Sequence, residues 1–384
     1  MIYNTDARQL HKKGEKAIKI FQTKAKSLDE RIALYNYIAM IYPALADVRD
    51  GKYKLSPLRV FPTKKEYFDF LKLRDRFDAE IPKMFIRDKE FHKEYISDIF
   101  VGATSVLSNV LEQDYSLDDK FSGKEFFDVF YSFMQSLGIE KLFLYLLKNG
   151  QIYGIDRDLD ATGGYTIFNP FTGESDVFIN YFDFDVTSMF VLAHEFGHVY
   201  DFQNYSHDLV NYNRYQYQSF YQEVISKLFE RLFIDFMLKN AIKTDATTDT
   251  LFDMESKNYE FLYTGYIFSL LKDSYIDSDY YKSLTKDDLA FLVKGGFKSY
   301  KQLKRFLDDS RPLDLEEDMA YLYGDIISMF LFERIKDDNY SLDSLKLFFE
   351  NCHDVFDIDS FMSVAGSSAE YLELYKKETK ILVK

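Results

Sequence analysis

Proline and glycine are scarce in this sequence, which holds six prolines and 16 glycines among 384 residues. Few helix breakers leave room for long helices. Apolar side chains recur at three-and-four spacing over residues 6–46, 64–111 and 124–148, a pattern typical of amphipathic helices. The same period returns near Asp185 and continues to the C-terminus. We therefore predict a mainly α-helical fold, with breaks in the last long region near Asn213, Asp245 and Pro312.

The pattern changes between residues 151 and 181, where short β-branched and aromatic runs (QIYGIDRD, GGYTIF and DVFINYF) alternate with glycine and proline. Such runs predict a small mixed β-sheet of two to four strands near residues 150–182. No flexible linker is visible. We divide the chain into an N-terminal helical region, 1–115, and a domain over 116–384 that contains the sheet.

The net charge of −15 is spread along the whole chain, which argues against nucleic acid or an anionic membrane as a partner. No run of about 18 apolar residues occurs, and the first residues lack an apolar signal segment. We expect a soluble, cytoplasmic protein and leave its oligomeric state open. Cys352 is the only cysteine, so a metal site would have to use histidine and carboxylate ligands.

The segment VLAHEFGHVYDF contains a His-Glu-x-x-His motif formed by His194, Glu195 and His198. Asp185 is a suitable N-cap for its helix. Histidines four apart on a helix lie about 6 Å apart along its axis, so both can reach one metal ion. Glu195 is rotated about 100° from His194, where it can act as the base that takes a proton from water. The motif predicts a mononuclear site with one Zn²⁺ per chain.

A third protein ligand is needed. Glu223 lies among aromatic and aliphatic residues in YQSFYQEVISKLFERLF, and a carboxylate on an apolar helix face needs a partner such as a metal. His207 is a weaker candidate. Asn204 stands where the metzincin motif requires a third histidine, so that option fails. Glu230 and Asp201 are candidates for orienting an imidazole from behind the ligands.

The sequences HEFGHV and EVISKLFE resemble the two zinc-binding helices of the M3 oligopeptidases, which include thimet oligopeptidase and the oligoendopeptidase F group. The resemblance implies a thermolysin-like zincin core within residues 116–384 and favours Glu223 as third ligand. Upstream, GGYTIF resembles the family's edge strand, which binds extended peptides through main-chain hydrogen bonds. That resemblance implies substrate binding at Gly163, Gly164 and Tyr165.

Downstream, AYLYGDIISMFLF resembles the family's tyrosine-bearing helix, whose phenol stabilises the oxyanion of the tetrahedral intermediate. The resemblance implies this role for Tyr321, with Tyr323 as a second, substrate-binding tyrosine. Two features depart from the family. The preceding stretch RFLDDSRPLDLEEDMA lacks the family's histidine, and the N-terminal region is shorter, which predicts a more open groove.

These features together predict a zinc metallopeptidase that hydrolyses internal bonds of oligopeptides. Two alternatives remain. One is a zinc carboxypeptidase with a related motif, which would need a free substrate C-terminus. The other is a non-catalytic peptide-binding protein on the same fold.

Overall fold

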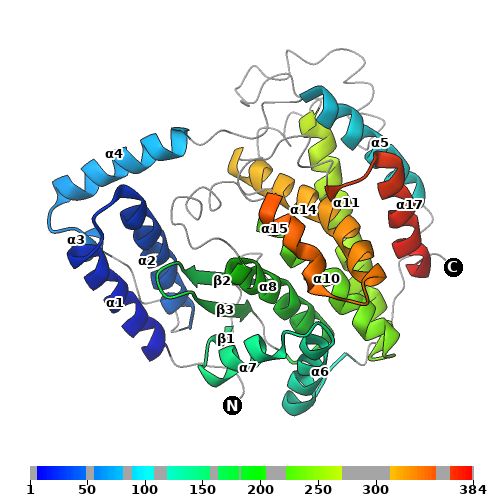
Figure 1. The fold of residues 1–384 in the computed structure, drawn as a ribbon, viewed down its shortest axis with the longest axis horizontal. Coiled ribbons are helices and arrows are strands. Elements are labelled where there is room, and N and C mark those ends of the chain that lie inside the picture. Colours follow the sequence, from blue (N-terminus) through cyan, green and yellow to red (C-terminus); the bar gives the residue numbers. More distant parts are fainter. Residues whose placement is uncertain are drawn as a thin grey trace.

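A computed structural model describes residues 7–48, 56–80, 89–107, 119–155, 163–180, 183–204, 222–269, 312–351 and 364–382. Most of these residues are helical, and three strands form one small sheet (Figure 1). The predicted fold class, mainly α with a small mixed sheet, is confirmed.

Seven helices precede the sheet among the described residues, and all but the short α3 lie in the regions where amphipathic patterns predict them. Helix α6 begins with a capping box. The Ser122 hydroxyl accepts a hydrogen bond from the Glu125 N–H, and the Glu125 carboxylate accepts one from the Ser122 N–H. Pro43 lies inside α2 without ending it. The bounds are α1 Arg8–Thr23, α2 Leu28–Val48, α3 Pro57–Val60, α4 Lys64–Glu80, α5 Lys89–Leu107, α6 Gly123–Ser136 and α7 Glu140–Lys148.

The sheet has the strand order β1-β3-β2, with β1 parallel and β2 antiparallel to β3. Its strands are β1 Ile152–Ile155, β2 Gly164–Asn169 and β3 Glu174–Asn180. Among the described strands, β2 is therefore at the edge. Because side chains alternate along a strand, Ile167 packs against the N-terminal helices, whereas Phe168 packs into the core on the other side.

The remaining helices follow the sheet. Asp185 caps α8, since its Oδ1 accepts the Ser188 N–H at 2.7 Å. The predicted breaks near Asp245 and Pro312 correspond to the starts of α11 and α14, and Asn213 lies outside the described residues. The elements are α8 Val186–Asn204, α10 Gln222–Lys239, α11 Thr244–Ser269, α14 Pro312–Asp337, α15 Lys346–Asn351 and α17 Ser368–Thr379, with short 3₁₀ turns at Leu342–Leu345 and Lys380–Leu382.

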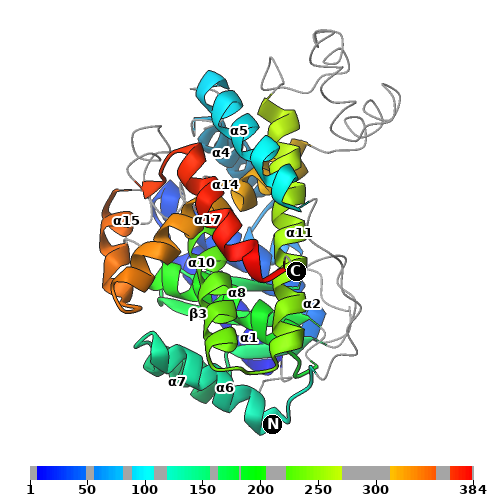
Figure 2. The ribbon, with the colours of Figure 1, turned by 90° about the vertical axis from the view of Figure 1, so that its right-hand side faces the viewer.

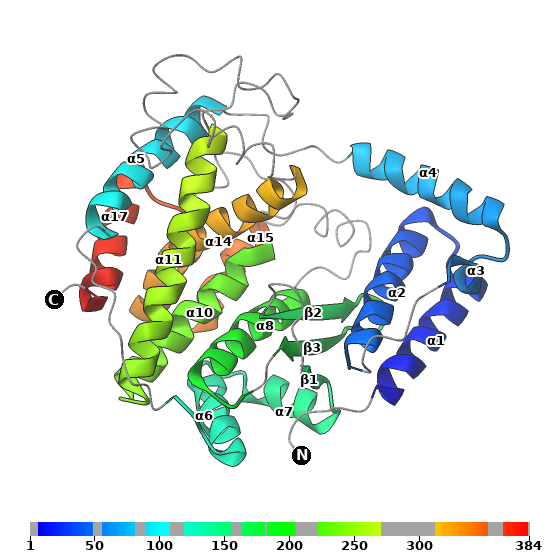
Figure 3. The ribbon, with the colours of Figure 1, turned by 180° about the vertical axis from the view of Figure 1, so that it is seen from behind.

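Two hydrophobic cores lie on opposite faces of the sheet. In the smaller core the four helices α1–α4 pack on one face of the sheet. In the larger core α8, α10, α11 and α14 pack on the other face (Figure 3). Helix α5 packs beside α11 and α17 and belongs to the larger core, although it precedes residue 115 (Figure 2). The division at residues 115 and 116 stays a prediction.

Helix α10 is held in place by a buried ion cluster around Arg231, which is 2% exposed. Its guanidinium pairs with Asp325 of α14 and Glu378 of α17, and lies 3.7 Å from Glu255 of α11. Arg231 Nε also donates to Ser328 Oγ. One arginine thus links α10 to three other helices, which fixes the helix that carries Glu223.

Within the part of the chain that the structure describes, no helix is both long enough and apolar enough to span a membrane.

Candidate metal site

Two glycines bring the helices of the site into close contact. A Cβ added at Gly197 of α8 would lie 2.5 Å from the Ser226 Cα of α10. A Cβ added at Gly324 of α14 would lie 2.7 Å from the Glu223 Cβ. No side chain fits at these distances, so glycine is required for both contacts. Helix α10 is therefore packed tightly between α8 and α14.

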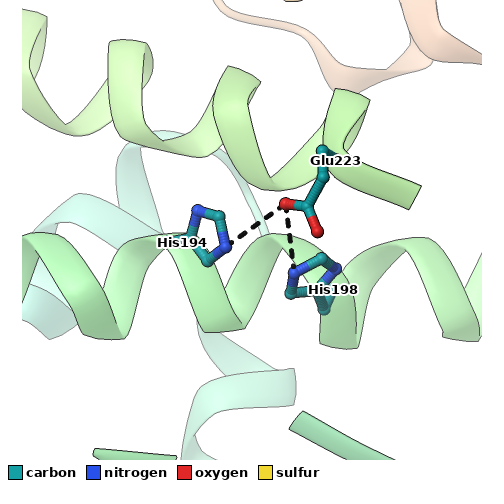
Figure 4. Close-up of side chains that lie close together, drawn as sticks. All are labelled: His194, His198 and Glu223. Carbon is teal, nitrogen blue, oxygen red and sulfur yellow. Dashed lines mark ion pairs between the residues drawn. The ribbon is translucent and has the colours of Figure 1, made fainter. Parts of the chain in front are cut away.

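The three predicted ligands meet where α8 faces the first turn of α10 (Figure 4). His194 and His198 project from successive turns of α8, and the Glu223 carboxylate points between their rings. Glu223 Oε2 lies 3.4 Å from His194 Nε2 and 3.6 Å from His198 Nε2. The Ser226 hydroxyl donates to the same carboxylate oxygen at 2.8 Å.

These atoms match what a zinc ion requires. One donor atom from each of the three residues lies within 4.8 Å of the others. Nitrogen and oxygen ligands sit about 2.0–2.1 Å from zinc, so neighbouring corners of the tetrahedron are about 3.3 Å apart. The nitrogen-to-oxygen separations of 3.4 and 3.6 Å are close to that value. The donor set, two imidazoles and a carboxylate, is one that catalytic zinc sites use.

Glu230 lies directly behind His194, with its Oε1 2.6 Å from His194 Nδ1. An Nδ1–H that donates to Glu230 leaves Nε2 facing the other ligands. Burial alone would lower the pKa of His194, but the hydrogen bond to Glu230 and the charges of Glu230 and Glu223 raise it to about 9. A proton and a metal ion therefore compete for Nε2, and metal affinity should fall as pH falls.

The charge of Glu230 is itself stabilised by a neighbour. Burial would raise the pKa of Glu230, whereas Lys227 and His194 lower it to about 2. Lys227 Nζ donates to Glu230 Oε2 at 3.0 Å. The carboxylate that orients His194 is thus ionised across the whole physiological range.

Glu195 is buried, with 3% of its surface exposed, and it faces the start of β2. The Thr166 hydroxyl lies 2.8 Å from Glu195 Oε2 and 3.1 Å from its backbone oxygen. Burial raises the pKa of Glu195 to about 7, against the opposing effects of His194 and Thr166. A carboxylate with a pKa near neutrality can both accept and return a proton.

Tyr321 lies beside the predicted ligands. Its ring is stacked on that of His194, with 6.3 Å between centroids, and on Phe261 at 5.0 Å. Tyr323 does not share this position: it is 1% exposed and buried in the larger core. Two residues along a helix correspond to about 200° of rotation, so Tyr321 and Tyr323 face opposite ways. Substrate binding by Tyr323 stays a prediction, and the buried position of its ring does not support it.

The three residues predicted to bind substrate lie at the start of β2. Gly164 approaches α8 and β3 closely, because a Cβ there would lie 3.0 Å from Glu195 Cγ and 2.7 Å from the Phe178 oxygen. A Cβ at Gly163 would lie 2.9 Å from Val191. The Tyr165 side chain points to the opposite face, where its hydroxyl donates to Asp47 at 2.8 Å. Substrate binding by Tyr165 stays a prediction, and of its groups only the backbone remains for that role.

Two further candidates stay predictions. Asp201 is buried on α8, one turn beyond His198, and is 1% exposed. His207 lies outside the described residues, as does Cys352.

The sequence interpretation missed Thr166 and Lys227. Thr166 could have been found from the strand period, since it shares a face with Gly164, but Lys227 had no distinguishing signal.

The Thr166→Val variant tests the support of Glu195. Valine has nearly the same shape but cannot donate, and a hydrogen bond to a charged group contributes about 1.5–3 kcal/mol. If Glu195 acts as a base, kcat should fall about tenfold, and the acidic limb of the pH–kcat profile should move to higher pH because the carboxylate loses a donor that lowers its pKa. The matched control, Thr166→Ser, keeps the hydroxyl and should stay near wild type. An unchanged profile in the valine variant would contradict this role.

Among known proteins, the matches to this chain are solved structures with a similar fold. No protein-family model and no curated protein sequence matches this chain. A structure assigned as an oligoendopeptidase F from Bacillus anthracis str. Ames superposes over 98% of this chain and 74% of its own, with 13% identity and a TM-score of 0.50. A second structure assigned as oligoendopeptidase F covers 99% of this chain and 69% of its own, with 13% identity and a TM-score of 0.54.

The chain therefore has a zincin-type fold, the class that the predicted sheet and motif helix indicate. More particularly, its fold is that of the M3 oligoendopeptidases, and the resemblance stated from HEFGHV and EVISKLFE is confirmed at the level of the fold. At 13% identity the roles of individual residues rest on the geometry of this chain.

Proposed function

We propose that this protein is a zinc metallopeptidase that hydrolyses internal peptide bonds of oligopeptides. One observation carries the proposal: the Glu223 carboxylate oxygen lies 3.4 and 3.6 Å from two imidazole nitrogens, beside a glutamate whose pKa burial raises to about 7. The two structures compared above are assigned as oligoendopeptidase F, which supports the choice of substrate class.

The proposed ligands are His194, His198 and Glu223, for one zinc ion per chain. When bound, zinc supplies a Lewis acid for the attacking water and the scissile carbonyl. Glu195 accepts a proton from that water through its carboxylate, which the Thr166 hydroxyl holds in place. It then returns the proton to the leaving amine.

Tyr321 donates its phenolic proton toward the oxygen that becomes negatively charged during the reaction. One such donor contributes about 3 kcal/mol in other hydrolases. The ring stacking on His194 and Phe261 restricts where the hydroxyl can move. A preorganised donor of this kind lowers the barrier without a reorganisation step.

The substrate binds as an extended strand along β2. β2 is at the edge of the sheet, where backbone groups can pair with an added strand. Gly164 and Thr166 lie on the face of β2 that meets Glu195. A peptide paired with this edge therefore runs past the catalytic carboxylate.

The test is cleavage of quenched fluorescent peptides blocked at both ends, measured with zinc-loaded protein and with protein stripped by a chelator. We expect about one zinc per chain, cleavage at internal bonds, loss of turnover on stripping and recovery when zinc is returned. A blocked C-terminus separates the two enzyme classes. Cleavage only of peptides with a free carboxylate would favour the carboxypeptidase alternative. Peptide binding without turnover in the zinc-loaded protein would favour the non-catalytic alternative.

A further inference from the structure

Lys227 is a buried lysine at the centre of the site. It lies on α10, four residues after Glu223 and three before Glu230, and its side chain is 7% exposed. Removing an ammonium group from water is costly unless charged or polar partners replace the solvent. The groups that contact the Lys227 ammonium therefore indicate its role in the structure.

Among the described residues, Lys227 donates hydrogen bonds to one partner on its own helix and one on α11. Its Nζ donates to Glu230 Oε2 at 3.0 Å and to Asn258 Oδ1 at 3.2 Å. These two hydrogen bonds tie the ammonium group to both α10 and α11. A lysine held only for the stability of the fold would not need to meet the residue that supports a metal ligand.

The contact with Glu230 leads directly to His194. The two carboxylate oxygens of Glu230 are divided, Oε1 lying 2.6 Å from His194 Nδ1 and Oε2 bonding Lys227. With both oxygens engaged, the carboxylate plane cannot turn without breaking one hydrogen bond. Lys227 therefore restricts the rotation of the group that determines the orientation of the His194 ring.

A second contact of Lys227 leads to Tyr321. Its Nζ lies 5.6 Å from the centre of the Tyr321 ring and 5.8 Å from that of Phe261. A cation within about 6 Å of an aromatic face is attracted to it. Tyr321 in turn is stacked on His194. The Lys227 ammonium group therefore contacts both Glu230 and Tyr321, two residues that pack against the His194 ring.

We propose that Lys227 is a positioning residue. It holds the Glu230 carboxylate behind His194, and it holds the Tyr321 ring against the His194 ring. The effect on His194 concerns metal binding alone, whereas the effect on Tyr321 rests on the proposed peptidase function. The two parts can be measured separately.

The first measurement is the zinc dissociation constant of four proteins: wild type, Lys227→Met, Glu230→Gln and the double variant. Each metal-free protein competes with a chromophoric chelator for zinc. Loss of a group that orients a ligand weakens metal binding by about 10–100-fold. We expect losses in this range for Glu230→Gln and about tenfold for Lys227→Met, with the double variant no weaker than Glu230→Gln alone, because Lys227 acts through Glu230.

Losses that multiply in the double variant would overturn the proposal, as would a Lys227→Met dissociation constant within about twofold of wild type. Lys239→Met is the control: Lys239 lies on the same helix, its side chain is 52% exposed, and its removal should leave zinc affinity unchanged. If Lys227→Met alone does not fold, the double variant contains no unpaired charge from this pair, and its comparison with Glu230→Gln decides the question.

The second measurement is kcat and KM at saturating zinc. We expect Lys227→Met to lower kcat with KM within about twofold of wild type, and to have no further effect when Tyr321 is already phenylalanine. A change in KM alone would overturn the role toward Tyr321. Wild-type protein that binds zinc but cleaves no peptide would contradict the proposed function, and the zinc measurements would still decide the role of Lys227 toward His194.

Discussion

Replacing Glu195 with glutamine should lower kcat about a thousandfold while zinc remains bound. Glutamine keeps the size of the side chain and can still bond Thr166, but it cannot accept a proton from water. General base catalysis contributes about 10²–10⁴-fold, and this variant removes it without touching a proposed ligand. The measurement is turnover of the end-blocked peptide, with zinc content determined on the same preparation.

The control for this variant is Glu373→Gln. Glu373 lies on α17 with its side chain 74% exposed, and the same change of charge there should leave kcat at the wild-type value. A Glu195→Gln protein that retains more than about a tenth of wild-type kcat would exclude Glu195 as the base. Loss of zinc along with activity would instead show that the variant disturbs the metal site.

The second large effect is expected for Gly197→Ala, which should both destabilise the fold and weaken zinc binding. The added Cβ would lie 2.5 Å from the Ser226 Cα and 2.7 Å from the Ile225 oxygen, and neither backbone atom can move unless α10 moves. Overpacking of this kind costs about 1–3 kcal/mol. Because Glu223 is on the first turn of α10, separating the helices also draws its carboxylate away from the imidazoles, and we expect at least about a tenfold loss of zinc affinity.

Denaturant unfolding and chelator competition measure the two effects independently. Gly173→Ala is the matched control, because nothing lies within 4 Å of a Cβ there and the strain comes only from its backbone φ of +69°. That variant should lose stability and keep zinc affinity. If Gly197→Ala binds zinc as tightly as Gly173→Ala does, the contact between α8 and α10 does not set the ligand geometry.

Much of this arrangement can be predicted from the sequence, because each prediction depends on a local period. The helices follow from three-and-four spacing and scarce glycine, and Asp185 caps α8 as expected. His194 and His198 lie on one side of α8 because they are four residues apart. Glu223 was found by its apolar surroundings, and the structure brings it to both histidines.

The omissions arise where a residue's role depends on which neighbour faces it. The resemblance places Tyr321 before Tyr323, and the packing of α14 shows that Tyr323 is the buried one. Lys227 reads as an ordinary polar residue of an amphipathic helix until Glu230, Asn258 and the Tyr321 ring are placed around it. Glu230 is on the same helix, but the contacts with Asn258 and Tyr321 join positions about 30 and about 95 residues apart, a distance over which no sequence period operates.

The two faces of β2 have a consequence for anyone who would transplant this site. Thr166, which donates a hydrogen bond to Glu195, alternates with Tyr165, which donates to Asp47 of α2, and with Ile167 in the core of the N-terminal helices. A minimal scaffold built from α8, α10 and the sheet alone would carry the proposed metal ligands but would leave the Tyr165 face of β2 exposed. The first helices of the chain therefore belong to any functional fragment, although they are remote from the proposed metal ligands.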